Sequence, residues 1–410
     1  MRTLAVRLIF LSQSFPPAHT PRAVQIARLL QHLRRSVTVL CCTPEASDPG
    51  FGIFPVEGEG LPADVEVIRL PRARWDRPLV RLLNRLAPEL LRRPDRERFW
   101  SRRAARRLLH GVDVRRDDVL VSFSSPVSDH LAALQVKRRT GCRWIAAFSD
   151  PWIENPLNRL AGRSLALARR WEEQVFQNAE RLIFTSAETV DRVMAAYPTA
   201  WRDKCRIVEH AWAGLAPGDH APAPRLLLRH LGNLYGDRSA GPLLAGLAEL
   251  ARLRPGVLAR MRIELIGHCE RAPETFPDYQ SLPVGTIVAR PPVSYREALA
   301  AMREADLLLV LDAPGQSSPF LPSKLVEYFG AGAPIAALTP PGTSARLLRE
   351  AGGWVADPGD PEGVARMLVQ AADGARDPEA WRSRSASVRA RFAPQRIAGL
   401  FAAIVDELVG

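Results

Sequence analysis

Residues 317–338 combine side chains that can bind a nucleotide. The segment reads SSPFLPSKLVEYFGAGAPIAAL, a Pro-bounded loop followed by a short predicted helix and an apolar strand. Lys324 stands at the start of that helix, where unpaired backbone N–H groups and the helix dipole favour a phosphate. Glu327 lies about one turn deeper on the same face, where its carboxylate can accept hydrogen bonds from a ribose diol. A phosphate and a ribose together indicate a nucleotide.

The choice of lysine at position 324 is unusual for this chain. Of its 56 basic residues only three are lysines, namely Lys137, Lys204 and Lys324, and the other 53 are arginines. Since this chain uses arginine almost everywhere else, the lysine suggests that this loop needs a compact ammonium group rather than a planar guanidinium. Coincidence explains this single observation equally well.

Length and composition indicate a multidomain globular protein. The 410 residues suffice for two to three domains, and the contents of 47% hydrophobic and 24% charged residues are ordinary for a globular enzyme. Five cysteines form neither a disulfide framework nor a zinc-binding spacing, which fits a reducing cytosol. No apolar run approaches the roughly 18 residues of a membrane span. Arg7 interrupts the apolar start, so we expect a buried first strand there rather than a signal peptide.

Positive charge is concentrated in residues 69–116. This segment has 16 arginines and five acidic residues, a net charge of +11 out of +12 for the chain. Apolar and aromatic residues alternate with the arginines at helical spacing across residues 77–110, as in a basic amphipathic helix attracted to an anionic membrane surface. A solvated helix pair with its apolar stripe packed on its own domain is the alternative. No nucleic-acid-binding module accompanies the charge, so we expect no nucleic-acid partner.

Strands and helices alternate along the whole chain. In the first half we expect strands at 4–11, 36–42, 65–70, 119–123, 143–148, 181–185 and 206–208, with helices at 22–34, 77–110, 128–140, up to 179, and 188–196. After a Pro/Gly-rich linker, the second half predicts strands at 226–231, 262–266, 287–289, 307–311, 334–338 and 353–355, and helices at 242–253, 294–304, 322–330, 343–351, 360–373 and 395–409. This alternation predicts two doubly wound α/β domains, which bind ligands at the carboxyl ends of their strands.

The ordered motifs of the chain resemble the retaining glycosyltransferases of the GT-B fold, group 1 (family 4). The matching segments are FPPAHTPRAVQIARLLQHLRRSVTVL, HLGNLYGDRSAGPLLAGLAEL, IELIGHCE, VSYREALAAMREADLLLVLDAP, PSKLVEYFGAGAPIAAL and GGWVADPGDPEGVARML. The resemblance implies two Rossmann-like domains facing a central cleft. The expected parts are an acceptor domain at 1–212, a linker at 213–224, a donor domain at 225–390, and a terminal helix at 391–410 that packs back towards the acceptor domain.

The resemblance assigns the donor site to the second domain. It implies that Glu327 binds the donor ribose, with an exposed helix residue or an i,i+3 partner of Lys324 as the alternatives. Lys324, Pro322 and Ser323 would face the diphosphate. The family's second acid falls at Pro319, so the paired-acid pattern is incomplete and the sugar is unidentified.

Further donor contacts come from the loops after two strands. Gly232 would let its loop approach the diphosphate, and Gly267 is the analogous position for the base or ribose. Arg238 matches a basic group on the phosphates, although one more surface arginine is the alternative. Asn233 stands where the family often has another basic residue.

The acceptor side is less complete. The loop before the first helix lacks the family's Gly-Gly pair, which leaves His19, Thr20 and Arg22 as polar contacts there, with a simply exposed histidine as the alternative at position 19. Asp150 is the candidate that orients the acceptor hydroxyl, and Trp152 could stack on a sugar. A simple Asp-Pro turn with Trp152 in the core is an equal alternative.

The expected reaction is transfer of a hexosyl group from a nucleotide-diphosphate sugar to a glycan or lipid-linked acceptor hydroxyl, with retention. Lys324 and Arg238 would stabilise the leaving diphosphate, and no metal or other cofactor is expected. Rival hypotheses are a GT-B nucleotide-sugar 2-epimerase and a non-catalytic nucleotide- or membrane-binding protein. The expected location is the cytoplasm, at the inner face of the cytoplasmic membrane.

Overall fold

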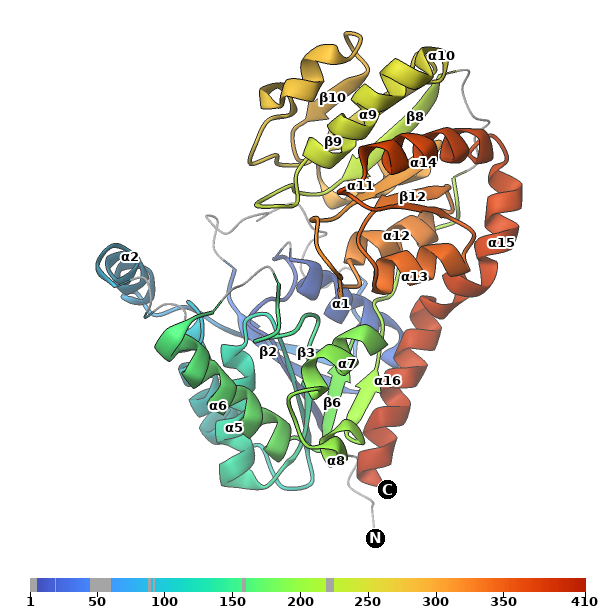
Figure 1. The fold of residues 1–410 in the computed structure, drawn as a ribbon. Coiled ribbons are helices and arrows are strands. Elements are labelled where there is room, and N and C mark those ends of the chain that lie inside the picture. Colours follow the sequence, from blue (N-terminus) through green and yellow to red (C-terminus); the bar gives the residue numbers. More distant parts are fainter. Residues whose placement is uncertain are drawn as a thin grey trace. The chain divides into compact units, whose positions relative to one another are not determined.

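A computed structural model describes residues 6–18, 20–44, 60–87, 90, 93–156, 160–218 and 225–410. Its contacts divide the chain into two compact units. The N-terminal unit comprises Met1–Glu209 and Pro394–Gly410, and the C-terminal unit comprises His210–Ala393. Each unit is built on one parallel β-sheet (Figure 1).

The N-terminal sheet has the strand order β3-β2-β1-β4-β5-β6-β7 within the described residues. Each strand pairs in parallel with its neighbours, and β4 is buried along its whole length, as expected for a sheet covered on both faces. The strands are β1 (Leu8–Leu11), β2 (Val37–Cys42), β3 (Val65–Leu70), β4 (Val119–Phe123), β5 (Arg143–Ala147), β6 (Arg181–Phe184) and β7 (Cys205–Ile207). The helices are α1 (Pro21–Leu33), α2 (Asp76–Leu86), α4 (Arg98–Arg107), η1 (Leu108–Val112), α5 (Ser128–Thr140), α6 (Gly162–Asn178), α7 (Ala187–Met194) and α8 (Thr199–Arg202).

The C-terminal sheet has the order β10-β9-β8-β11-β12-β13 within the described residues, again all parallel. Its strands are β8 (Leu226–Leu231), β9 (Met261–Ile266), β10 (Ile287–Arg290), β11 (Leu307–Leu311), β12 (Ile335–Leu338) and β13 (Trp354–Ala356). Its helices are α9 (Gly241–Leu253), α10 (Pro255–Leu258), η2 (Pro273–Thr275), η3 (Pro277–Ser281), α11 (Tyr295–Arg303), α12 (Ser323–Ala331), α13 (Thr343–Glu350), α14 (Pro361–Gly374) and α15 (Pro378–Arg391).

Most predicted elements lie within two residues of their observed bounds, because buried parallel strands are short and almost wholly apolar. Helix α15 was missed. Its sequence is dominated by arginine, serine and alanine, yet Trp381, Ser385 and Val388 recur at helical spacing and are all buried. That sparse buried stripe was the only available signal, and stacking of Trp381 on Phe329 and Trp354 supplies the packing that stabilises the helix.

The last helix, α16 (Pro394–Val409), is part of the N-terminal unit. It packs against α1, and the ring of Phe401 lies 5.7 Å from that of Phe10 in an edge-on arrangement. Glu407 accepts hydrogen bonds from Arg181 at 3.1 Å and Arg206 at 2.8 Å. Apolar packing and ion pairs therefore hold the end of the chain on the N-terminal unit.

In both sheets the order in which strands are added reverses at the first strand. In the N-terminal sheet β1 lies between β2 and β4, and in the C-terminal sheet β8 lies between β9 and β11. Within each sheet, the carboxyl ends of the two strands at this point, β1 and β4 or β8 and β11, are where such folds bind ligands.

Candidate functional site

The side chain of Lys324 lies at the carboxyl end of β8. Its amino nitrogen is 3.3 Å from Nε2 of His230. Gly232 has a φ of +127°, and a Cβ added there would lie 2.7 Å from the Lys324 amino nitrogen. Desolvation, followed by the positive charge of Arg238, lowers the pKa of Lys324 to about 7. The absence of a side chain at position 232 thus leaves room for this amino group.

His230 is a buried residue of this site that sequence reasoning missed. Its Nδ1 lies 2.9 Å from the carbonyl oxygen of Leu309, which can only accept a hydrogen bond, so Nδ1 carries the proton and Nε2 faces Lys324 as an acceptor. Burial and the charge of Lys324 lower the pKa of His230 well below its usual value, which keeps the ring neutral. A histidine inside an apolar strand gives no sequence signal for this contact.

Arg238 is not a surface arginine. One guanidinium nitrogen is 2.8 Å from Oδ1 of Asp312, whose side chain is buried with 4% exposed, and 12% of the Arg238 side chain is exposed. Asp312 also accepts hydrogen bonds from the hydroxyls of Ser318 at 2.7 Å and Thr339 at 3.3 Å. Among the described residues, Nε of Arg238 is buried without a hydrogen-bond acceptor. The site therefore holds two neighbouring cations and an N–H donor that a bound anion could satisfy.

Two loops at this edge of the sheet support each other. Gly267 follows β9 with a φ of +144°, and a Cβ there would come within 2.4 Å of the Gly232 carbonyl oxygen. The backbone N–H of His268 donates to Oδ1 of Asn233 at 3.1 Å. Asn233 thereby fixes the β9 loop against the β8 loop, a contact that requires an amide oxygen rather than a basic side chain.

Glu327 is buried in the middle of α12, with 6% of the residue exposed. Its carboxylate accepts a hydrogen bond from the backbone of Ala213 at 3.0 Å and another from the hydroxyl of Tyr295 at 3.0 Å. The exposed-residue alternative is therefore wrong. Pro322 and Ser323 stand at the first turn of the same helix, where Pro322 occupies the N-cap position. Lys324, Glu327 and this helix start thus belong to one short element.

The candidate residues of the N-terminal unit lie near the ends of β4 and β5. Thr20 caps α1 by accepting a hydrogen bond from Ala23 N–H at 3.1 Å. Arg22 donates through Nε to the carbonyl of Ser124 at 2.6 Å, while its Nη2 is buried without an acceptor among the described residues. Burial lowers the pKa of Arg22 to about 10, and the negative charge of Asp150 partly opposes that shift.

Trp152 lies in the hydrophobic core of this unit, with 5% exposed. This burial favours the core alternative over a stacking face for a sugar. Asp150 is partly exposed just after β5. His19 lies outside the described residues.

The two basic helices differ in their packing. One face of α4 and of the turn after it packs in the hydrophobic core through Trp100, Ala104 and Leu108. This is the alternative in which the apolar stripe packs on its own domain. In α2 Asp76 alone is buried, and apolar side chains at its start and along one face are exposed: Trp75 by 64%, Leu82 by 52% and Leu86 by 69%. The amphipathic surface available to a partner is therefore α2 rather than α4.

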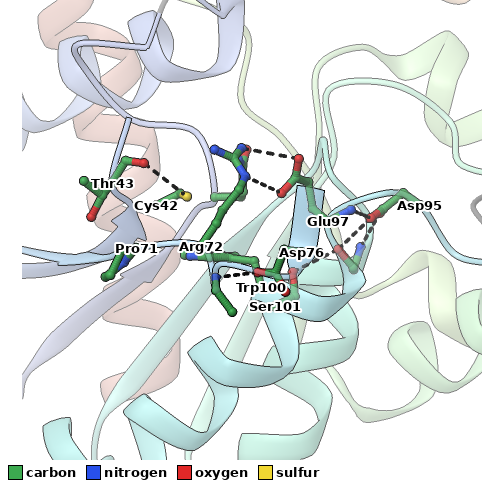
Figure 2. A network of polar contacts seen from close by, with 12 residues as sticks. Cys42, Thr43, Pro71, Arg72, Asp76, Asp95, Glu97, Trp100 and Ser101 are labelled. Carbon is green, nitrogen blue, oxygen red and sulfur yellow. Dashed lines mark hydrogen bonds and ion pairs between the residues drawn. The ribbon is translucent and has the colours of Figure 1, made fainter. Parts of the chain in front are cut away.

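Buried polar contacts attach α4 to the rest of its unit. Figure 2 shows Arg72 facing Glu97, with Asp95, Trp100 and Ser101 close by. The indole N–H of Trp100 donates to the carbonyl of Leu70 at 2.8 Å, and Ser101 donates to Asp129 at 2.8 Å. Burial raises the pKa of Asp129 well above its usual range.

Within the described part of the chain, no cluster of three or more His, Cys, Asp or Glu side chains could hold a metal ion. The same residues include no helix that is long and apolar enough to cross a membrane.

Comparisons with known proteins relate the chain to glycosyltransferases. Residues 19–211 match the family model described as glycosyl transferase 4-like domain. No curated protein sequence matches the chain.

Solved structures match both units together. Anabaena Alr3699/HepE, solved with UDP and glucose, is 14% identical, with a TM-score of 0.66 over 98% of this chain and 99% of that one. The α,α-trehalose-phosphate synthase (UDP-forming) of Burkholderia xenovorans, solved with glucose-6-phosphate, is 14% identical, with a TM-score of 0.66 over 98% and 100%. The lipopolysaccharide outer core galactosyltransferase WaaB is 13% identical, with a TM-score of 0.62 over 98% and 100%.

Proposed function

We propose that this protein transfers a sugar from a nucleotide-diphosphate sugar to a hydroxyl group, because residues 19–211 match the glycosyl transferase 4-like domain model and the chain has the GT-B fold. The observation that carries the proposal is the pair of cations at the end of β8. The charge of Arg238 acts on Lys324, and the missing side chain of Gly232 leaves room for the Lys324 amino group. A diphosphate would satisfy the unpaired N–H of Arg238 and favour the charged form of Lys324.

We propose UDP as the nucleotide part of the donor. Structurally similar proteins have been solved with UDP or UDP-glucose bound, which supports this choice. In our proposal Glu327 accepts hydrogen bonds from the ribose, with Tyr295 and Ala213 holding its carboxylate in place. The backbone N–H groups at the start of α12, next to Ser323, face the phosphates.

During transfer, negative charge develops on the departing diphosphate oxygen. Lys324 and Arg238 stabilise that charge because both are already oriented by His230 and Asp312. We propose that the configuration at the anomeric carbon is retained and that the leaving phosphate takes the acceptor proton. Asp150, with Arg22 nearby, is the residue that we propose to orient the acceptor hydroxyl. The proposed reaction requires no metal ion.

We also propose that the protein attaches peripherally to an anionic membrane on the cytoplasmic side, where it meets a lipid-linked acceptor. Helix α2 supports this location, because it exposes Trp75, Leu82 and Leu86 while Arg81 and Arg85 are also exposed. Aromatic and leucine side chains can enter the interface while guanidinium groups contact anionic headgroups.

A thermal-shift screen with UDP-, GDP-, ADP- and dTDP-sugars tests the donor, followed by product analysis with lipid-linked acceptors. We expect UDP-sugars to raise the melting temperature and E327Q to abolish transfer. The matched control is E362Q, which changes an exposed carboxylate on α14 of the same unit. The proposal fails if no nucleotide sugar binds, or if E327Q and E362Q transfer sugar at the same rate.

A further inference from the structure

A cavity of about 220 Å³ lies between α4, α5 and α6 in the N-terminal unit. The acceptor-side candidates Arg22 and Asp150 do not line it. Its polar and aromatic wall is formed by Arg93, Arg98, Arg102, Ser128, Gln135 and Trp171, and the remaining lining residues include no acidic side chain. A volume of this size accommodates a small polar group rather than a whole lipid.

Of the residues that the structure describes, three arginines and no acidic side chain line the cavity. Arg98 donates to the carbonyls of Leu90 at 2.5 Å and Arg93 at 3.1 Å, and Arg93 donates to the hydroxyl of Ser164 at 3.1 Å. Among the described residues, Arg102 is exposed and makes no ion pair. Burial and the neighbouring charge of Arg102 lower the pKa of Arg98, and the charge of Asp95, which is hydrogen-bonded to Ser128, partly opposes that shift. An anion between Arg98 and Arg102 would relieve the repulsion between their charges.

The cavity walls are fixed before any ligand binds. Asp95 accepts hydrogen bonds from both the backbone and the hydroxyl of Ser128, each at 2.8 Å. The hydroxyls of Ser128 and Ser101 are 2.9 Å apart, which links α5 to α4. These bonds already use the serine hydroxyl hydrogens, and they hold α4 and α5 together, so the arginine-bearing wall loses little conformational entropy when it binds an anion.

The cavity is also connected to the exposed helix α2. Arg103 of α4 forms an ion pair with Asp76 at the start of α2, at 2.8 Å. Arg96 donates to the side chain of Asn84 at 3.3 Å. Helix α4, which supplies Arg98 and Arg102 to the cavity, is therefore joined to the helix whose apolar face is available to a bilayer.

We propose that this arginine-lined cavity binds the phosphate ester group of a membrane lipid whose chains remain in the bilayer contacted by α2. Guanidinium groups bind phosphate oxygens through paired N–H donors, and Trp171 with Leu131 offers an apolar wall to the adjoining glycerol or sugar carbons. Free phosphate esters share this chemistry. The exposed apolar stripe of α2 favours the lipid as their source. This inference rests on the proposed membrane attachment.

The test compares two arginines of the same helix. R102Q removes a cavity guanidinium, whereas R106Q removes an exposed guanidinium of α4 that does not line the cavity. Binding is measured by titration with glycerol 3-phosphate and by co-sedimentation with phosphatidylcholine vesicles containing phosphatidic acid. We expect R102Q to weaken both interactions about tenfold, and R106Q to change them less than twofold.

A double variant, L82Q/L86Q, separates the two proposals. It should lose vesicle binding and still bind glycerol 3-phosphate, because neither leucine lines the cavity. Equal losses in R102Q and R106Q would overturn the cavity site, since net charge alone would then explain binding. Binding of glycerol 3-phosphate to the wild type without any vesicle binding would overturn the lipid as its source. Circular dichroism of each variant establishes that it is folded.

Discussion

At the scale of single residues, Lys324 has the most informative environment. It stands between a neutral histidine and an arginine that is already paired with Asp312. Desolvation and the Arg238 charge bring its pKa to about 7, where a model lysine titrates at 10.5. Near neutral pH, a bound anion can therefore decide whether this group is charged.

We predict that UDP binding at pH 8.5 is accompanied by uptake of nearly one proton. The free protein holds Lys324 mostly neutral at that pH, and a diphosphate raises its pKa by favouring the ammonium form. Calorimetric titration in two buffers of different ionisation enthalpy measures this uptake. K324M should bind UDP about 10- to 100-fold more weakly.

The same group has a stability consequence without ligand. Since the folded-state pKa of Lys324 is lowered, the unfolded chain binds more protons between about pH 7 and pH 10.5. The contribution of this lysine to stability thus rises with pH across that window. The free energy of unfolding of the wild type, compared with that of K324M, should be larger at pH 9.5 than at pH 7. For the UDP titration, a binding enthalpy that does not depend on the buffer would contradict the predicted proton uptake by Lys324.

At the scale of elements, the strands of the C-terminal sheet are joined by a buried ionic cluster. Glu264 on β9 accepts from Arg229 on β8 at 2.9 Å, with 3% and 9% of the side chains exposed. Arg262 and Arg290 contact the same carboxylate at 3.0 and 3.4 Å. Burial alone would raise the pKa of Glu264, but the surrounding arginines outweigh it and lower the pKa.

We predict that E264A destabilises the C-terminal unit by roughly 3–5 kcal/mol, because it leaves Arg229 buried without its main partner. Urea unfolding measures the change. The control is E249A, which removes an exposed i,i+3 pair with Arg252 and should leave the unfolding midpoint unchanged. Similar midpoints for the two variants would show that the cluster contributes nothing beyond a surface ion pair.

At the scale of the whole molecule, the last helix belongs to the unit formed by the first half of the chain. Phe401 is 1% exposed and contacts Phe10 of β1, whereas its neighbour Leu400 is 36% exposed. The N-terminal core is thus completed only when α16 has been synthesised and packs on it.

We predict that F401A destabilises the N-terminal unit by about 3–5 kcal/mol through the cavity that it leaves. Hydrogen exchange measured by mass spectrometry should speed up in peptides covering β1 and α1, while peptides of the C-terminal unit keep their wild-type rates. L400A is the control on the same helix and should have little effect. Uniform acceleration in both units would contradict the separate stabilisation of the N-terminal core.

The sequence by itself determined the strands, most helices, the two doubly wound sheets and the family resemblance. Those features follow from local apolar patterns and from the order of short motifs, which a chain carries without reference to its folding. Lys324 was identified in the same way, because glycine, lysine and a helix start are local signals.

Only the tertiary structure decided which partners these residues have. Asp312 pairs with Arg238 because β11 ends beside β8 in the sheet. Trp152 proved to be a core residue, and α2 rather than α4 was left with an exposed apolar face. Burial depends on which surfaces meet across long separations in the chain, and periodicity along one helix carries no information about that.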